Sequence, residues 1–196
     1  MTPPLIIELP EWAAEIASRR THYPTDDERI ALAIELSHEN MRRREGGPFG
    51  AAVFEEQTGR LVAVGVNLVR RLANCTLHAE MTALMFAGQA HGCHSLHRDD
   101  GVTYMLATSC DPCAMCVGAI LWSGVRRVVG AATRDDAMEV GFDEGPVFDD
   151  SWGYLAERKV HVQHGVQRAE AREVLRRYVE MGGLVYNGES VIPRDT

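Results

Sequence analysis

The sequence predicts a single α/β domain of three layers, with helices on both faces of one sheet. Stretches with apolar residues at helical spacing alternate with short stretches typical of strands along most of the chain. Helices that alternate with strands in this way cover both faces of a sheet. The 196 residues suit one domain with a sizeable core, and neither an internal repeat nor a convincing linker divides them.

The N-terminal part is expected to be an extension packed on this domain. Residues 1–24 contain a short amphipathic stretch in which Trp12 and Ile16 lie at helical spacing. We therefore expect the domain proper to cover residues 25–181. Residues 182–196 form a C-terminal segment beyond the last expected helix.

The first main helix has a clear start and a clear stop. Thr25 and Glu28 have the spacing of a capping box, in which each side chain bonds the other residue's backbone N–H. Apolar residues follow at helical spacing, which predicts a helix over 26–45. Gly46-Gly47-Pro48 should end it.

Strands and helices alternate from residue 50 onward. Gln57-Thr58-Gly59 separates two strand-like stretches and predicts a hairpin. Gly182-Gly183 should end the last helix. The expected elements are strands 51–55 and 60–69, helix 78–90, strand 102–107, helix 113–123, strand 126–132, an irregular or helical stretch 137–156, strand 159–166 and helix 169–181.

Composition favours a small-molecule substrate. The formal net charge of −8 disfavours a nucleic-acid partner, because phosphate contacts need clustered Lys and Arg. The five cysteines are an odd number in a chain that is not a small secreted scaffold, so we expect no disulfide framework. No secretory signal is visible, and no apolar stretch is long enough to span a bilayer. We expect a cytoplasmic protein without a membrane partner.

Two short motifs together supply a metal-ligand set. His78-Ala79-Glu80 offers one imidazole, and Pro112-Cys113-Ala114-Met115-Cys116 offers two thiols. One imidazole and two thiolates suit a catalytic zinc ion with an open fourth position for water. Cys113 and Cys116 stand three apart at an expected helix start, so both sulfurs share one face, and the helix N-terminus favours their thiolate forms.

Glu80 lies beside the expected ligands and need not be one of them. It can take a proton from the metal-bound water and later deliver a proton to the leaving ammonia. Cys-x-x-Cys alone is equally compatible with structural zinc or redox chemistry. A structural site normally has four protein ligands, and no second Cys-x-x-Cys or His pair is present. Cys110 is an alternative fourth ligand, although it is expected to end a strand.

These motifs resemble the cytidine/deoxycytidylate deaminase superfamily. Within it, the chain looks most like bacterial guanine deaminases, over about residues 28–150. The histidine–glutamate pair and the two cysteines after a proline are also the signature of zinc-dependent nucleobase deaminases. The resemblance rests on Gly46-Gly47-Pro48-Phe49-Gly50, Asn67, His78-Ala79-Glu80, Thr108-Ser109-Cys110-Asp111-Pro112-Cys113-Ala114-Met115-Cys116, Gly118-Ala119-Ile120, Ala131-Ala132-Thr133-Arg134-Asp135-Asp136-Ala137 and Gly141-Phe142-Asp143-Glu144.

The resemblance implies a fold, a cofactor and roles for several residues. The fold would be the three-layer α/β/α cytidine-deaminase-like one, with a five-stranded mixed sheet. One Zn²⁺ per chain would be bound by three ligands, with Glu80 as the general acid/base. The expected ligands are His78, Cys113 and Cys116. The expected substrate-binding residues are Asn67 at the ring edge, Phe49 and Trp122 by stacking, and Ala79 through backbone N–H groups near it.

A second carboxylate and a lid are also implied. Glu144 stands where relatives carry Asp, and would orient the exocyclic amine of the substrate and share in proton transfer. Relatives use their C-terminal segment as a lid that the two chains of a dimer exchange. Tyr186 or a neighbour would cap the site here, and the expected partner is a second copy in a homodimer, with the C-terminal segment as the exchanged part.

The implied activity is zinc-dependent hydrolysis of guanine to xanthine and ammonia. Aminotriazines such as ammeline present a similar edge and are expected as further substrates. The alternatives are deamination of adenosine in tRNA, or of another free nucleobase or nucleoside. A noncatalytic zinc module is disfavoured, because such a site has no use for Glu80.

Overall fold

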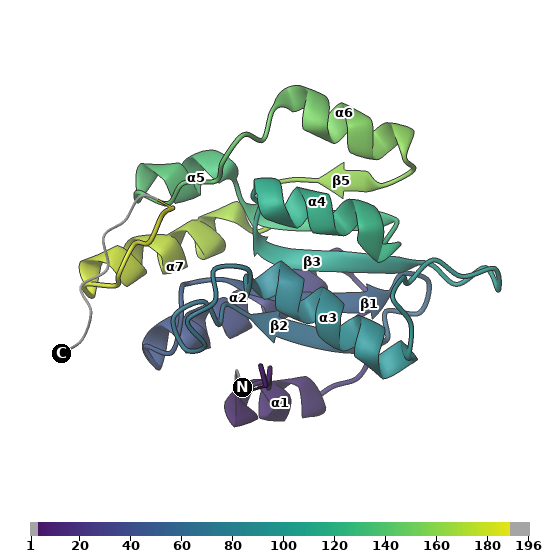
Figure 1. Cartoon of the computed structure of the whole chain (residues 1–196), viewed down its shortest axis with the longest axis horizontal. Helices are drawn as coiled ribbons and strands as arrows, with labels where there is room; N and C mark the ends of the chain where they lie inside the picture. The colour runs from purple at the N-terminus through teal and green to yellow at the C-terminus, as the bar shows by residue number, and fades with distance from the viewer. Residues whose placement is uncertain (1–3, 189–196) are drawn as a thin grey trace.

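A mixed five-stranded sheet forms the centre of the molecule (Figure 1). The structure is a computed structural model that describes residues 4–188. The strands lie in the order β2-β1-β3-β4-β5; β1 is antiparallel to both neighbours, whereas β3, β4 and β5 are parallel. Their bounds are β1 Gly50–Glu55, β2 Leu61–Val66, β3 Tyr104–Cys110, β4 Arg127–Ala132 and β5 His161–Gln163.

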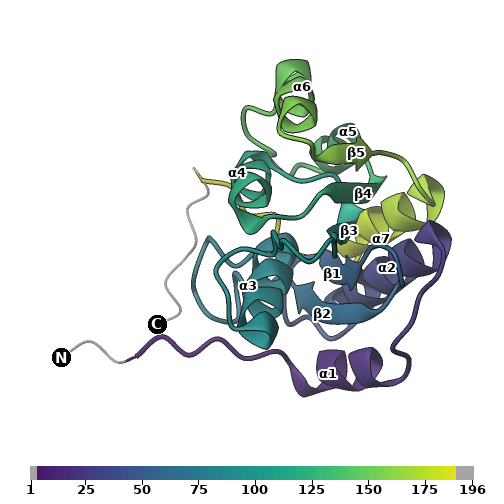
Figure 2. The same ribbon diagram turned by 90° about the vertical axis from the view of Figure 1, so that its right-hand side faces the viewer.

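Helices cover both faces of this sheet, which confirms the expected three layers. Figure 2 shows α2 and α7 on one side and α3 and α4 on the other. Each side has its own cluster of buried apolar side chains. The helices are α1 Glu11–Ser18, α2 Asp26–Arg42, α3 Ala79–His91, α4 Ala114–Ser123, α5 Arg134–Glu139, α6 Asp149–Glu157 and α7 Arg168–Glu180.

Local sequence signals set the ends of the main helices. The capping box of α2 is confirmed: the Glu28 N–H donates to Thr25 Oγ1 at 3.3 Å, and the Thr25 N–H donates to Glu28 Oε2 at 3.2 Å. Helices α3 and α4 both end at glycines in the left-handed region, Gly92 with φ 64° and Gly124 with φ 82°. Glycine carries no Cβ penalty in that conformation.

Two strands are shorter than the sequence predicts. Strand β2 ends before Asn67, whose Oδ1 accepts hydrogen bonds from the N–H groups of Gly47 and Val69 and so turns the chain. Strand β5 is an edge strand that pairs only with β4, and Gly165 at φ 77° follows it closely. Both strands therefore end at a turn of the chain.

The N-terminal helix packs against the rest of the chain. Trp12 and Ile16 of α1 are buried, and the Arg43 guanidinium lies 5.4 Å from the Trp12 ring centroid. Among the described helices, none is long and apolar enough to cross a membrane. All five cysteines are free thiols.

Candidate metal centre and active site

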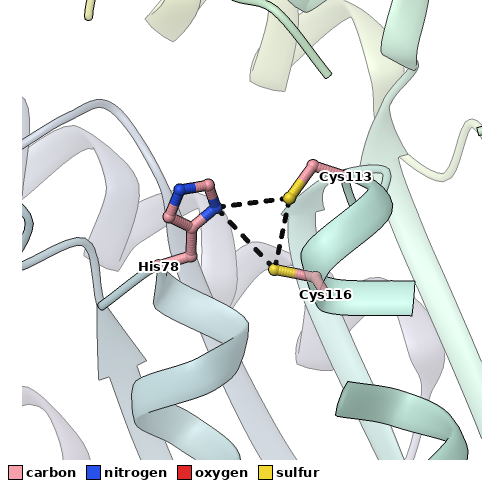
Figure 3. A group of neighbouring side chains, drawn as sticks. All are labelled: His78, Cys113 and Cys116. Carbon is pink, nitrogen blue, oxygen red and sulfur yellow. Dashed lines mark hydrogen bonds between the residues drawn. The ribbon is translucent and has the colours of Figure 1, made fainter. Parts of the chain in front are cut away.

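Three metal-ligating side chains meet where α3 and α4 begin. His78 is the N-cap residue of α3, Cys113 is the N-cap residue of α4, and Cys116 lies in the first turn of α4. The imidazole and the two sulfurs point toward one another (Figure 3). The strand–loop–helix connections at one end of the sheet therefore assemble the ligand set expected from the sequence.

The distances fit one tetrahedral zinc ion. His78 Nδ1 lies 3.4 Å from Cys113 Sγ and 3.8 Å from Cys116 Sγ, and the two sulfurs are 3.6 Å apart. Ordinary zinc bond lengths place two sulfurs about 3.8 Å apart and a nitrogen about 3.5 Å from each sulfur. The donor set and its spacing therefore match zinc with three protein ligands and an open position.

The two thiols differ in acidity because they lie next to each other. The hydrogen bond from Cys116 and the nearby His78 lower the pKa of Cys113 to about 4. The same contact with Cys113, together with burial, raises the pKa of Cys116 well above its usual value. Cys113 therefore favours the thiolate form even without a metal, and metal binding would remove the proton of Cys116.

Two carboxyl groups lie beside the ligands, and both are nearly buried. Burial, followed by the nearby Cys113, raises the pKa of Glu80 to about 7. Burial raises the pKa of Glu144 to about 8, with further contributions from Cys113 and Glu80. The Ala114 N–H donates to the Glu144 backbone oxygen at 3.0 Å, which ties this segment to the start of α4.

A cavity of ~470 Å³ opens over these groups, within the usual range for a small-molecule site. Aromatic side chains form one wall: the rings of Phe49 and Phe142 meet edge-on at 5.0 Å, and Tyr186 meets Phe142 at 5.8 Å. His78, Glu80, Cys113 and Glu144 form the polar part. The cavity thus combines an aromatic wall with acid–base groups and metal ligands.

A sequence profile described as the cytidine and deoxycytidylate deaminase zinc-binding region matches residues 24–132, more than half of the chain. The chain belongs to this family. The matched region contains all three ligands and Glu80, so zinc is the metal of this centre and the protein is a hydrolytic deaminase.

The deaminase is similar to known guanine deaminases along most of its length. It is 39% identical to guanine deaminase of Bacillus subtilis over 119 residues, 61% of this chain and 72% of the relative. A solved guanine deaminase from Nitrosomonas europaea is 38% identical, with a TM-score of 0.86 over 91% of this chain and 97% of that one. A solved structure in complex with 2,6-diaminopurine is 37% identical, with a TM-score of 0.88; the match covers 95% of this chain and 98% of that one.

Asn67 and Tyr186 lie close to each other beside Gly47, and Tyr186 also lines the cavity. Asn67 is 1% exposed, and neither its Nδ2 nor the Tyr186 hydroxyl has a hydrogen-bond partner of ordinary geometry within residues 4–188. A Cβ on Gly47 would lie 2.6 Å from the Tyr186 hydroxyl and 3.4 Å from Asn67 Cγ. The missing side chain at Gly47 therefore leaves room for the Tyr186 hydroxyl and the Asn67 amide to lie next to each other at the edge of the cavity.

Trp122 lies outside this cavity, which removes the basis for its expected stacking on the substrate. Its side chain is 83% exposed in a separate groove of ~250 Å³ between α3 and α4. Cys116 and Ile120 are one helical turn apart on the buried face of α4. Trp122 comes two residues after Ile120, about 200° around the helix, and faces away from the domain.

Two features of the site were not assigned from the sequence. Phe142 forms the aromatic wall with Phe49, although it stands in the quoted segment that ends at Glu144. Asp111 is buried and bonds His164, which comes from a distant part of the chain. Asp111 directly precedes the Pro-Cys motif, so its position at a strand end was an available signal. Ala79 is fully buried at the first position of α3, between His78 and Glu80, and its role in substrate binding stays a prediction.

Proposed function

We propose that this deaminase hydrolyses guanine at C2 to give xanthine and ammonia, and that it also accepts aminotriazines such as ammeline. The observation that carries this proposal is a pair of buried carboxyl groups, Glu80 and Glu144, that face one cavity beside the zinc ligands. Similarity to guanine deaminases over most of the chain supports the choice of base.

Glu80 carries the proton transfers in this proposal. Zinc, when bound by His78, Cys113 and Cys116, supplies the Lewis acidity that makes water a nucleophile near neutral pH. Glu80 takes a proton from the attacking water and gives it to a ring nitrogen of guanine as the C2–O bond forms. Glu80 then carries the proton of the new C2–OH group to the amino nitrogen; the C2–N bond breaks, ammonia leaves, and the C2 carbonyl of xanthine forms. A pKa of about 7 suits a group that must both accept and return protons.

Recognition of the base uses the remaining groups of the cavity. The Nδ2 group of Asn67 can donate to an acceptor at the ring edge, while its Oδ1 is held by backbone N–H groups. Phe49 and Phe142 offer an apolar wall against which a purine can pack. Backbone N–H groups near Ala79, at the start of α3, can bind the purine carbonyl. Glu144 holds the exocyclic amine and assists its protonation.

The C-terminal segment acts as a lid in this proposal. Leu184 accepts a hydrogen bond from the Tyr178 hydroxyl at 2.7 Å. The Asn187 side chain accepts from the Asp143 N–H at 2.8 Å and donates to the Gly141 oxygen at 3.1 Å. These bonds hold Tyr186 over the cavity, where it excludes water. Residues 189–196 of the expected segment lie outside the described residues.

One assay panel tests the function and the lid together. Ammonia release is measured with guanine, ammeline, cytosine, adenine, cytidine and guanosine, and an anticodon stem-loop of tRNA serves as the nucleic-acid alternative. We expect guanine to give the highest kcat/KM and the stem-loop to give no turnover. A chain that ends after Met181 should lose most guanine turnover. No activity on guanine would overturn the function, and full activity of the shortened chain would overturn the lid.

A homodimer is the second part of the proposal, and the face around Trp122 is its expected contact. Helix α4 carries no charged residue, and Trp122 and Met85 are exposed large apolar side chains beside the groove between α3 and α4. Figure 1 shows α3 and α4 on the same face of the molecule. Exposed apolar surface of this kind marks an interaction site, and a second copy offers the matching surface.

The Trp122→Glu variant should shift the protein from dimer to monomer, because the new charge would have to be buried in the contact. Sedimentation velocity over a range of concentrations measures this. Phe148→Glu is the matched control, because Phe148 is an exposed aromatic residue outside the groove. A dimer unaffected by Trp122→Glu would exclude this face.

A further inference from the structure

A buried carboxylate lies next to the metal-binding loop, and the chemistry proposed above does not use it. Asp111 follows β3 and precedes Pro112, two residues before Cys113, and its side chain is only 7% exposed. Its backbone N–H donates to the Ala132 oxygen of β4 at 2.8 Å. A carboxylate removed from water in this way needs a hydrogen-bonding partner.

That partner comes from the far side of β4. The Nδ1 atom of His164 lies 2.9 Å from Asp111 Oδ1, and His164 directly follows β5. Because β3, β4 and β5 are parallel, their carboxyl ends share one edge of the sheet. Gly130 of β4 makes the contact possible, since a Cβ there would lie 2.3 Å from Asp111 Oδ1.

The histidine is itself held in place. The Trp152 ring of α6 meets the His164 ring edge-on, with centroids 4.9 Å apart. A carboxylate only accepts hydrogen bonds, so Nδ1 of His164 carries the hydrogen that it donates. The backbone N–H of Arg134, at the start of α5, also faces the Asp111 carboxylate. Asp111 thus joins the metal loop to β5 and to the segment that leads to Glu144.

We propose that His164 is a positioning residue for the metal centre: through Asp111 it holds the turn that presents Cys113. Without His164, the buried Oδ1 of Asp111 would lose its side-chain hydrogen-bond partner, and the turn would shift toward water. Partners that orient metal ligands typically change metal affinity or activity by about 10–100-fold when removed. The inference rests on the zinc centre and does not depend on which base is the substrate.

The test measures zinc release from the zinc-loaded protein into a chromogenic chelator. We expect His164→Ala to release zinc about 10-fold faster than wild type and to lower kcat by a similar factor at unchanged KM. His164→Asn should restore most of the wild-type behaviour, because the Asn Nδ2 can donate from nearly the position of Nδ1. His161→Ala is the matched control, an exposed histidine of β5 three residues before His164, and it should change neither quantity.

A second variant tests the same contact from the opposite side. Gly130→Ala places a methyl group against Asp111 and should also speed zinc release, with the histidine still present. Zinc release at the wild-type rate in both His164→Ala and Gly130→Ala would overturn the inference. So would a lower melting temperature of metal-free His164→Ala with unchanged zinc release, which indicates a structural role alone. If His164→Ala speeds zinc release but the wild-type protein does not deaminate guanine, this inference stands and the proposed function is wrong.

Discussion

Replacing Glu80 with glutamine should stop most turnover while zinc stays bound. Glutamine has nearly the same shape but cannot accept the proton of the attacking water. Loss of a general acid/base group costs about 10²–10⁴ in rate, and a residue that moves several protons should lie at the upper end. We therefore expect kcat for guanine, measured by ammonia release, to fall about 10⁴-fold. Elemental analysis should still find one zinc ion per chain.

The control separates this role from a structural one. Glu157→Gln changes an exposed glutamate at the end of α6 and should leave both kcat and zinc content unchanged. A Glu80→Gln protein that keeps more than a tenth of the wild-type kcat would remove Glu80 from the proton path. Joint loss of zinc and of folding would indicate that Glu80 supports the metal centre structurally.

The sequence predicted the parts of the site that depend on local spacing. His78 and the two cysteines lie at helix starts, where a few residues determine direction, and the structure brings them within bonding range of one metal ion. Short-range spacing also predicted the capping box at Thr25, and hydrophobic periodicity predicted the order of strands and helices. These features follow from short-range geometry, which the sequence contains directly.

Contacts between distant segments were harder to predict. The Asp111–His164 pair depends on strand order, since only the sequence β3-β4-β5 in the sheet brings these two strand ends together over Gly130. The stacking expected of Trp122 came from the resemblance, and helical periodicity argues against it, because Ile120 marks the buried face of α4. Periodicity within an element is therefore a stronger guide to the direction of this side chain than the resemblance was.

Replacing Glu144 should have the second-largest effect, and two substitutions separate its roles. Glu144→Asp keeps a carboxyl group but withdraws it by one methylene, and a displacement of about 1 Å can cost about 10²-fold. Glu144→Gln keeps the reach and can still contact the exocyclic amine, but it cannot transfer a proton. We expect kcat for guanine to fall at least 10²-fold in both variants, with a smaller change in KM for Glu144→Gln.

The pH dependence identifies the form of Glu144 that acts. Burial raises the pKa of Glu144 to about 8, so its protonated form dominates at pH 7. Glu80 has a pKa of about 7 and can therefore accept a proton near neutral pH. Two carboxyl groups with separated pKa values suit one base and one acid in a single site. The wild-type kcat should therefore fall as the pH rises through about 8, and this fall should be absent in Glu144→Gln, which stays neutral. A Glu144→Gln variant with the wild-type rate and the same alkaline fall would show that another group titrates there, and would leave Glu144 as a residue that only shapes the cavity.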